Sequence, residues 1–410
     1  MYFSSYKTLK HKRRGSMKPA IGLELEFLLI GPDGTIQNRA DEVIEHPSND
    51  GFIQRELSKA MIEVTAEPSR DIKTVEKNFR KELKLLEKIV SQLGMRAIPV
   101  SVIDPSAIII SNDPERPRGM TKRGLIGEEA RTLEHYICGS HIHIDTLSKP
   151  EDAYKQFVLM TAMDPVFALM SSSPIIRGQN SKKDHRVDLY RSQVFREFPT
   201  VGQLMPYPDS FEHIFQRQQQ IYEELKVAAE RKRISFEGVE PTDCCWGPLR
   251  YTRLNTFEGR ASDANMPSAL IALALMYQGI SNLVQEQKPR ITVDEKNEKP
   301  AEELFVLSQN EITIPSFRTL KELETAGIME GLENDHLRGY LTNVVMTSSQ
   351  GVEPENIGRL GVFLDFLRKR ETFADQITAF AKNRGFYRSG AVDPAGARSL
   401  NLFIADTYQQ

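Results

Sequence analysis

The feature that most constrains the fold of this chain is a ten-residue stretch near its start in which two kinds of side chain alternate. From Ile21 to Ile30, apolar residues fill one set of alternate positions, and Gly22, Glu24, Glu26 and Leu28 fill the other. Alternation with a period of two is typical of a β-strand, so both glutamates should project from the same face. Two like charges side by side repel each other unless a cation lies between them or water covers that face.

The same polar pattern recurs on three further predicted strands. These are Met61–Glu67 with Glu63, Ile137–Asp145 with His141 and His143, and Arg253–Ala261 with Thr256, Glu258 and Arg260. One such face could be solvated surface, but four of them predict a sheet whose polar face is a binding site. Paired carboxylates with one or two histidines suit Mg²⁺ or Mn²⁺, because hard cations prefer oxygen ligands. The His-x-His pair alone is also compatible with a zinc site or with ordinary hydrogen bonding.

The remaining periodicity predicts the fold class. Apolar residues at helical spacing predict a helix from Val75 to Leu93 that ends at Gly94, and a strand is expected at Met95–Val102. Further helices are predicted after Pro150, from Ser268, and over most of the chain from Ser316 to about Gly385. We therefore expect an α+β fold with a largely antiparallel sheet, helices packed behind it and a helical C-terminal third.

The domain organisation follows from where these patterns begin and end. Residues 1–17 are rich in Lys and Arg, contain no acid and lack the apolar core of a signal peptide, so we expect a solvated basic extension. Residues 18–410 are expected to form a single catalytic domain, with a motif-bearing sheet core at 18–284 and a mostly helical part at 285–410. The strongly polar stretch Gln285–Glu303 is interpreted as an exposed connection.

Composition excludes several classes of function. The net charge of −3 argues against bulk nucleic-acid binding, which requires a basic surface. No run of 18 apolar residues is present, and Ala269–Val284, the nearest to one, is interrupted by polar residues and predicts a buried helix. Three cysteines, an odd and sparse count for a long chain, indicate a reducing compartment. We therefore expect a cytoplasmic protein that binds neither membrane nor nucleic acid.

Five motifs, in order from about Ile21 to Leu275, resemble those of the type 2 glutamate–cysteine ligases. That family consists of ATP-dependent carboxylate–amine ligases related to glutamine synthetase. The motifs are Gly22–Phe27, Glu56–Val64, Gly139–Ile144, Tyr190–Arg196 with Pro199 and Thr200 after the turn Ser172–Pro174, and Thr256–Arg260 with Asp263.

The resemblance implies a glutamine synthetase-like catalytic fold, with the sheet curved around nucleotide and metals. It implies two or three Mg²⁺ or Mn²⁺ ions held by Glu24, Glu26, Glu63, His141 and Glu258, with Glu56 and His143 as further candidates. It implies a catalytic role for Glu258, Arg260 and Arg191, and contacts from Arg191, Arg260, Tyr190, Arg253 and Ser173 to ATP or substrate. For the arginines, salt bridges to neighbouring acids are the structural alternative. A homo-oligomer is also implied.

The reaction implied by the resemblance is amide formation driven by ATP. The γ-carboxylate of glutamate is first phosphorylated, and an amine then displaces phosphate from the acyl phosphate; cysteine, as in glutathione biosynthesis, is the family's usual amine. The chain departs from the family pattern at Cys244–Tyr251, at the charged stretch Ile175–Leu189, and at Gly259, where a β-branched residue is usual. The glycine predicts a close backbone approach, and the first two departures leave the donor and the amine open.

Two other classes of function remain as alternatives. A metal-dependent hydrolase could use His141, His143 and nearby acids around Zn²⁺, and it would act without nucleotide. A nucleotide-binding protein on the same fold could act as a sensor without turnover. The acids present on every polar strand favour the ligase over both.

Overall fold

The computed structural model describes residues 17–388 and 390–408, so the predicted basic extension lies outside the described residues except at Met17. A seven-stranded sheet in the order β2-β3-β1-β5-β7-β6, with β4 paired to β1, forms its centre. All the pairings in this sheet are antiparallel, as the sequence predicted. Its strands are β1 Ile21–Ile30, β2 Ile53–Arg55, β3 Met61–Thr65, β4 Arg96–Ile98, β5 Ser140–Asp145, β6 Leu249–Tyr251 and β7 Thr256–Gly259.

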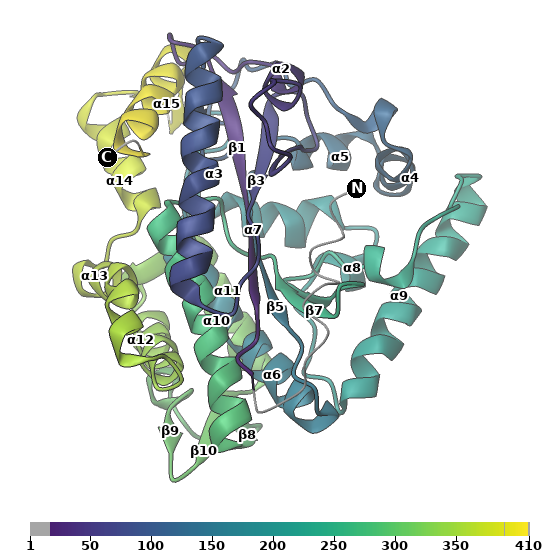
Figure 1. Cartoon of the computed structure of the whole chain (residues 1–410), viewed down its shortest axis with the longest axis vertical. Helices are drawn as coiled ribbons and strands as arrows, with labels where there is room; N and C mark the ends of the chain where they lie inside the picture. The colour runs from purple at the N-terminus through teal and green to yellow at the C-terminus, as the bar shows by residue number, and fades with distance from the viewer. Residues whose placement is uncertain (1–16, 389, 409–410) are drawn as a thin grey trace.

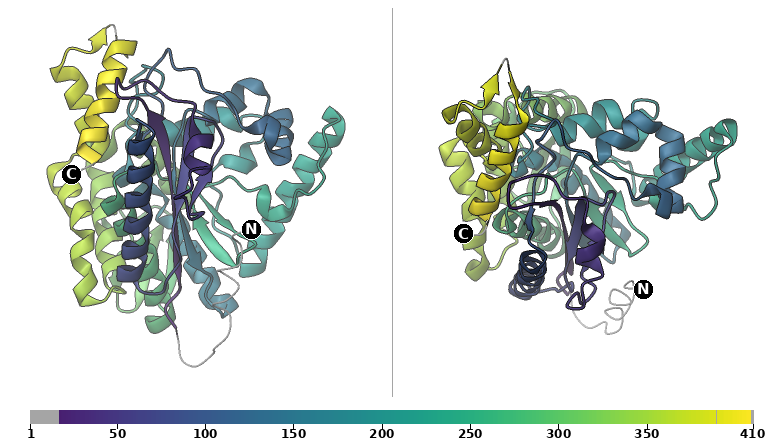
Figure 2. Two further views of the ribbon diagram at one scale, coloured as in Figure 1. Left: turned by 45° about the horizontal axis from the view of Figure 1, so that its top comes forward. Right: turned by 90° about the horizontal axis from the view of Figure 1, so that it is seen from above.

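Helices lie on both sides of this sheet (Figures 1 and 2). They are α2 Ala40–Ile44, α3 Ile72–Gln92, α4 Pro117–Ile126, α5 Glu128–Glu134, α6 Pro150–Ala162, α7 His185–Leu189, α8 Pro199–Gly202, α9 Phe211–Lys232, α10 Pro267–Gln287, α11 Phe317–Met329, α12 Asp335–Ser349, α13 Gly361–Lys369, α14 Phe373–Asn383 and α15 Pro394–Tyr408. In Figure 1, α3, α10 and α12 are on the left of the strands, whereas α4, α8 and α9 are on the right. The polar and the apolar faces of the sheet are therefore covered by different sets of helices.

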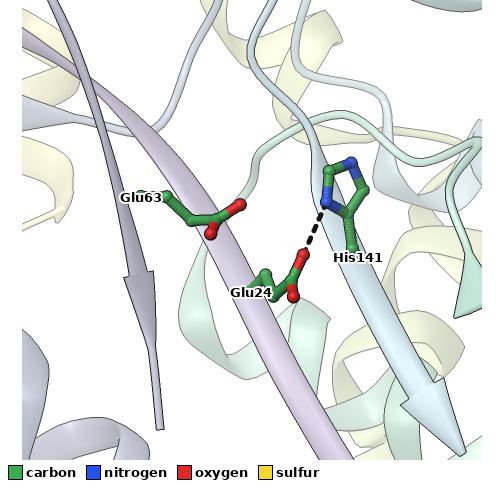
Figure 3. Close-up of side chains that lie close together, drawn as sticks. All are labelled: Glu24, Glu63 and His141. Carbon is green, nitrogen blue, oxygen red and sulfur yellow. Dashed lines mark hydrogen bonds and ion pairs between the residues drawn. The ribbon is translucent and has the colours of Figure 1, made fainter. Parts of the chain in front are cut away.

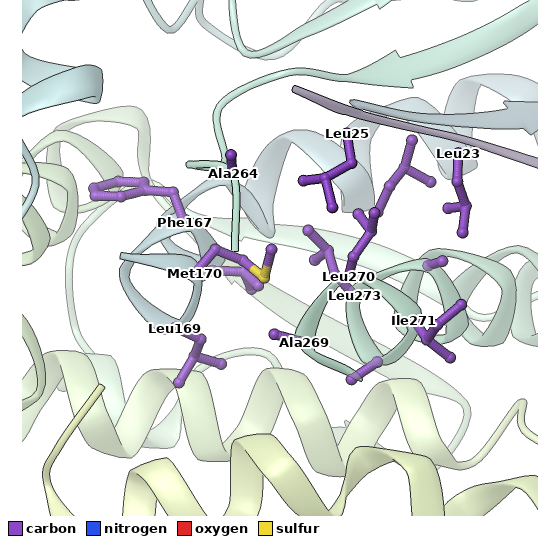
Figure 4. Packing of buried hydrophobic residues seen from close by; sticks show 14 of the residues in the cluster. Leu23, Leu25, Phe167, Leu169, Met170, Ala264, Ala269, Leu270, Ile271 and Leu273 are labelled. Carbon is purple, nitrogen blue, oxygen red and sulfur yellow. The ribbon is translucent and has the colours of Figure 1, made fainter. Parts of the chain in front are cut away.

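The apolar face of β1 packs against α10, the most apolar helix of the chain. Leu23 and Leu25 lie above Leu270 and Leu273 (Figure 4). Every residue from Ala269 to Val284 is buried, which confirms the prediction of a buried helix. Helix α10 is long and apolar enough to cross a membrane, yet 89% of its most apolar window is covered by the rest of the protein. Its hydrophobicity is thus explained by its place in the core.

The ends of the predicted elements differ from the observed ones in ways that matter for the site. The strand predicted at Met95–Val102 is limited to β4, and the strand predicted at Arg253–Ala261 is limited to β7, so Arg260 lies just beyond its end. Helix α3 begins one turn earlier than predicted, because the Asp71 carboxylate accepts hydrogen bonds from the amides of Lys73 and Thr74.

The stretch Gln285–Glu303 is not only an exposed connection. It contains β8, Arg290–Asp294, which pairs in parallel with β10, Glu311–Pro315; the short β9, Leu307–Ser308, completes a three-stranded sheet. Within β8, Ile291 and Val293 do alternate with polar residues, but this short run lies in a stretch whose high charge led to its interpretation as a connection. A two-stranded pair, Tyr387–Arg388 with Ala391–Val392, adds to the otherwise helical C-terminal third.

Candidate active site

Strand register brings the predicted polar residues into one row across the sheet. Glu24 of β1 lies opposite His141 of β5, and Glu26 lies opposite Glu63 of β3. In the same way, His143 of β5 lies opposite Glu258 of β7. Because side chains at paired positions in an antiparallel sheet share a face, the row spans β3, β1, β5 and β7. The period-two pattern of the sequence therefore predicted this face correctly.

All seven predicted metal ligands belong to one cluster of three overlapping groups. Their ligand atoms form three groups in which every atom lies within 4.8 Å of the others: Glu24, Glu63 and His141; Glu24, His143 and Glu258; and Glu26, Glu56 and Glu63. Figure 3 shows the first group, with the His141 ring beside the Glu24 carboxylate at an Nδ1–Oε2 distance of 2.9 Å. Because the groups share Glu24 and Glu63, the geometry can hold two or three ions near one another.

The protonation behaviour of the cluster shows how strongly it favours a cation. Burial and the neighbouring charge of Glu56 raise the pKa of Glu26 to about 8. Burial and the charge of Glu24 raise the pKa of Glu63 well above its usual value. Desolvation and like charge are the two effects that a bound divalent ion would relieve.

Two buried atoms point to the same conclusion. Nε2 of His141 and Oε2 of Glu56 are buried and have no hydrogen-bond partner. Buried polar atoms are normally satisfied, so unpartnered atoms in a cluster of this chemistry fit the ligand set of hard divalent ions. The residues present are therefore suited to Mg²⁺ or Mn²⁺.

Glu258 lies between two arginines. Nε of Arg250 on β6 donates to its Oε2 at 2.7 Å, and Nη1 of Arg260 contacts its Oε1. Burial alone would raise the pKa of Glu258, but the charges of both arginines outweigh it and hold that pKa far below its usual range. Arg250 was not predicted as a site residue, although it lies in the segment that departs from the family pattern.

Two cavities flank the cluster. The first, called here the arginine cavity, has a volume of about 360 Å³; its basic lining residues are Arg116, Arg118, Lys122, Arg250, Arg253 and Arg260. The second, called the loop cavity, has a volume of about 620 Å³ and is bordered by residues 49–55, with Arg55 as its single Lys or Arg. The lining residues common to both cavities are Glu24, Glu63, His143 and Leu254. The predicted ligands thus lie where a basic and a largely non-basic space meet.

The basic residues of α4 were missed in the sequence. Lys122 lies over the rings of Trp246 and Phe195, at 4.3 and 5.0 Å from their centres, and pairs with the buried Glu134. Burial lowers the pKa of Lys122 to about 8. Four basic residues between positions 116 and 123 were the available signal, but such runs more often mark a solvated face.

The expectations for Arg191 and Ser173 differ from what the structure shows. Arg191 is buried and its guanidinium pairs with Asp164, at 2.8 Å, and with Glu324, which is the salt-bridge alternative. Ser173 is also buried and donates its hydroxyl hydrogen to Asp263 Oδ2 at 2.7 Å. Neither residue lines the arginine or the loop cavity, although Arg191 lines the small pocket that adjoins the arginine cavity. Their partners lie far away in sequence, which no local pattern reveals.

The structure brings Tyr190 and Arg253 to the arginine cavity. Both line the arginine cavity, with Arg253 exposed at its edge and Tyr190 packed beside Arg260 and Trp246 in a smaller adjoining pocket. The structure therefore brings together ten of the twelve predicted site residues and separates Arg191 and Ser173 from them.

Comparison with known proteins gives relatives of low identity. The chain is 27% identical over 280 residues to "Putative glutamate--cysteine ligase 2" of Ruegeria pomeroyi, covering 66% of this chain and 67% of that protein. It is 29% identical over 191 residues to "Putative glutamate--cysteine ligase 2-2" of Frankia casuarinae, covering 45% of this chain. The second match spans only 21% of the Frankia protein's length, so much of that protein has no counterpart here.

Solved structures show the fold. The chain superposes on a glutamate–cysteine ligase of Francisella tularensis in complex with AMP with a TM-score of 0.62, 12% identity, and coverage of 97% and 90% of the two chains. A bifunctional glutathione synthetase of Pasteurella multocida gives 0.54 and 12%, covering 96% of this chain and 52% of that one. The fold is therefore the glutamine synthetase-like fold that the resemblance implied. Because the model of glutamate–cysteine ligase family 2 matches residues 20–292, on the same strands that carry the polar row, the chain belongs to that family.

Proposed function

We propose that this protein is an ATP-dependent carboxylate–amine ligase that requires Mg²⁺ or Mn²⁺, with glutamate as the carboxylate donor. The observation that carries the proposal is the row of seven metal-ligand candidates between a basic and a non-basic cavity. Membership of glutamate–cysteine ligase family 2 supports the same reaction class. A zinc hydrolase is less well supported, because four of the seven candidates are strand carboxylates and a fifth, Glu56, is also a carboxylate.

The chemistry explains why such a face is needed. A carboxylate oxygen is a poor leaving group, so ATP must first convert the carboxylate to an acyl phosphate. Phosphoryl transfer depends on positioning and on stabilisation of negative charge rather than on a protein nucleophile. Divalent ions held by the cluster would neutralise the negative charge that develops during phosphoryl transfer.

The second half of the reaction is attack by the amine. Its nitrogen bonds to the carbonyl carbon, the carbon–oxygen bond to phosphate breaks, and phosphate leaves with the electron pair. Of the two protons lost by the ammonium group, one ends on phosphate and the other in solvent. In this proposal Arg250 and Arg260, which both contact Glu258, hold the anionic donor and the departing phosphate.

The test is phosphate release from ATP with Mg²⁺ and glutamate across a panel of amines, with the products identified by mass spectrometry. We expect release that depends on the amine, together with a γ-glutamyl product. Glu24→Ala should abolish turnover while the melting temperature stays close to that of the wild type. Phosphate release without any amine product, or full activity of Glu24→Ala, would contradict the proposal.

A further inference from the structure

A third cavity adjoins the arginine cavity and has no role in the function proposed above. This side cavity has a volume of about 280 Å³ and lies between α4 and residues 236–246. It shares Arg116, Asp243 and Trp246, among others, with the arginine cavity, so the two spaces lie next to each other. Residues 244–246 belong to the segment where the sequence departs from its family.

Phosphoryl transfer determines which co-substrate can lie there. The attacking and leaving oxygens lie roughly in line at the transferred phosphorus, so the donor and the nucleoside approach the cluster from opposite sides. The loop cavity has one guanidinium among its lining residues, Arg55, and this is paired with Asp41 at 2.7 Å and with Glu115. The anionic donor therefore belongs in the arginine cavity, and the nucleoside in the loop cavity.

The amine must reach the carbonyl carbon of the bound donor, so it has to bind in a space next to the arginine cavity. The side cavity provides that space. At its junction with the arginine cavity lie groups of opposite charge, Arg116 and Asp243. Nη1 of Arg116 is buried without a hydrogen-bond partner, and the nearest acid oxygen, Oε2 of Glu56, is 3.9 Å away.

Asp243 is held in a fixed position. Its Oδ1 accepts a hydrogen bond from Arg118 at 3.0 Å, and its Oδ2 accepts one from the amide of Glu240 at 3.2 Å. A carboxylate offers about four lone-pair sites, so two bonds leave capacity for an ammonium group. The rest of the lining combines an apolar wall of Leu125, Phe236, Val239 and Trp246 with four further basic residues. Each of these, Arg118, Lys122, Arg131 and Arg250, is already paired with a carboxylate.

We propose that the side cavity binds the amine co-substrate and that this co-substrate is an α-amino acid with an apolar side chain larger than that of cysteine. Arg116 binds its carboxylate, Asp243 orients its amino group, and the apolar wall holds its side chain. This inference rests on the proposed ligase function and names the substrate class for it. When fixed side chains of opposite charge bind both charged groups of a substrate, the site discriminates strongly against analogues that lack one of those groups.

The experiment compares amines that differ only in the carboxylate, with glutamate, ATP and Mg²⁺ held constant. The pairs are phenylalanine with phenethylamine and cysteine with cysteamine. We expect the wild type to prefer phenylalanine over phenethylamine and over cysteine. Arg116→Gln should raise the KM for phenylalanine by about tenfold or more, since a charge-assisted hydrogen bond is lost. The KM for phenethylamine should change by less than about threefold.

Two variants complete the design. Arg231→Gln removes the same charge from an exposed position on α9 and should leave every KM unchanged. Phe236→Ala should reduce the preference for phenylalanine over alanine. Calorimetric binding of phenylalanine to the wild type, in the presence of Mg²⁺ and a non-hydrolysable ATP analogue, gives a readout independent of turnover and of how well a variant folds; phenethylamine should bind more weakly.

The outcomes separate this inference from the function on which it rests. Turnover that prefers cysteine or cysteamine would overturn the substrate class but keep the ligase. An Arg116→Gln effect on the KM for glutamate instead of phenylalanine would assign Arg116 to the donor and overturn the inference. Absence of release with every amine would overturn the proposed ligase function itself.

Discussion

Substitution of Gly259, which lies between Glu258 and Arg260, tests whether the site packs tightly against helix α10 of the core. A Cβ atom at this position would lie 2.5 Å from Cε2, 2.6 Å from Oη and 2.9 Å from Cζ of Tyr277 on α10. Carbon atoms in contact prefer about 3.5–4.0 Å, so the ring or the strand would have to move by about 1 Å. Tyr277 is 8% exposed, so its ring has little free space.

The size of the effect follows from two opposing contributions. Overpacking a core typically costs about 1–3 kcal/mol. Replacing glycine by alanine in a strand returns about 0.5–1 kcal/mol of backbone entropy. Gly259→Ala should therefore lower the free energy of unfolding by up to about 2.5 kcal/mol. It should also reduce turnover, because β7 carries Glu258 and leads directly into Arg260.

Denaturant unfolding measures this change, and Gly358→Ala is the matched control. No atom lies within 4 Å of a Cβ at Gly358, so alanine should be neutral or stabilising there. Tyr277→Leu removes the three clashing atoms, and in that background Gly259→Ala should no longer destabilise. If Gly259→Ala proves as stable as Gly358→Ala, or if the two substitutions act additively, the steric explanation is wrong.

Three further predictions concern charge. Glu63→Gln should raise the melting temperature without metal, because it removes a carboxyl group whose ionised form is disfavoured by burial and by neighbouring like charges. It should also diminish the rise that Mg²⁺ produces; an unchanged metal response would remove Glu63 from the ligand set. Arg191→Met should lower the free energy of unfolding by about 3–5 kcal/mol, since two buried acids lose their partner, whereas a raised KM for ATP with normal stability would restore the substrate role. Burial would raise the pKa of Asp113, but the hydrogen bonds and charge of Arg131 outweigh it and lower the pKa to about 2. This group therefore stabilises the fold fully above about pH 4 and loses that contribution as the pH falls toward 2, so acid unfolding of Asp113→Asn should depend less on pH than that of the wild type.

The sequence predicted the polar face well because a β-strand imposes a period that can be read locally. Glu24 and Glu26 identify the polar face of β1. In the same way, His141 and His143 identify the polar face of β5, and Glu258 identifies that of β7. The apolar alternation of β1 and the uninterrupted apolar run of α10 likewise predicted the core. The close approach expected at Gly259 is confirmed, because a Cβ atom there would lie only 2.5 Å from Cε2 of Tyr277.

What could not be predicted depends on contacts between distant segments. Arg191 pairs with Asp164 and Glu324, which lie 27 and 133 residues away, and no spacing rule links them. Arg250 lies on a three-residue edge strand, too short to show alternation. The side cavity joins α4 to residues 236–246, more than a hundred positions apart, so its shape exists only in the folded chain.

The register of the central sheet limits how this sequence can change. Because side chains alternate between faces, loss or gain of one residue within β1, β3, β5 or β7 would move every later side chain of that strand to the opposite face. A single-residue deletion ahead of Glu63 in β3 would direct a carboxylate toward the apolar helices and a methyl or isopropyl group toward the metal ligands. Substitutions can alter the walls of the three cavities one residue at a time, whereas insertions and deletions can be accepted only in the connecting loops. Variation in length among functional relatives should therefore fall between these strands and never within them.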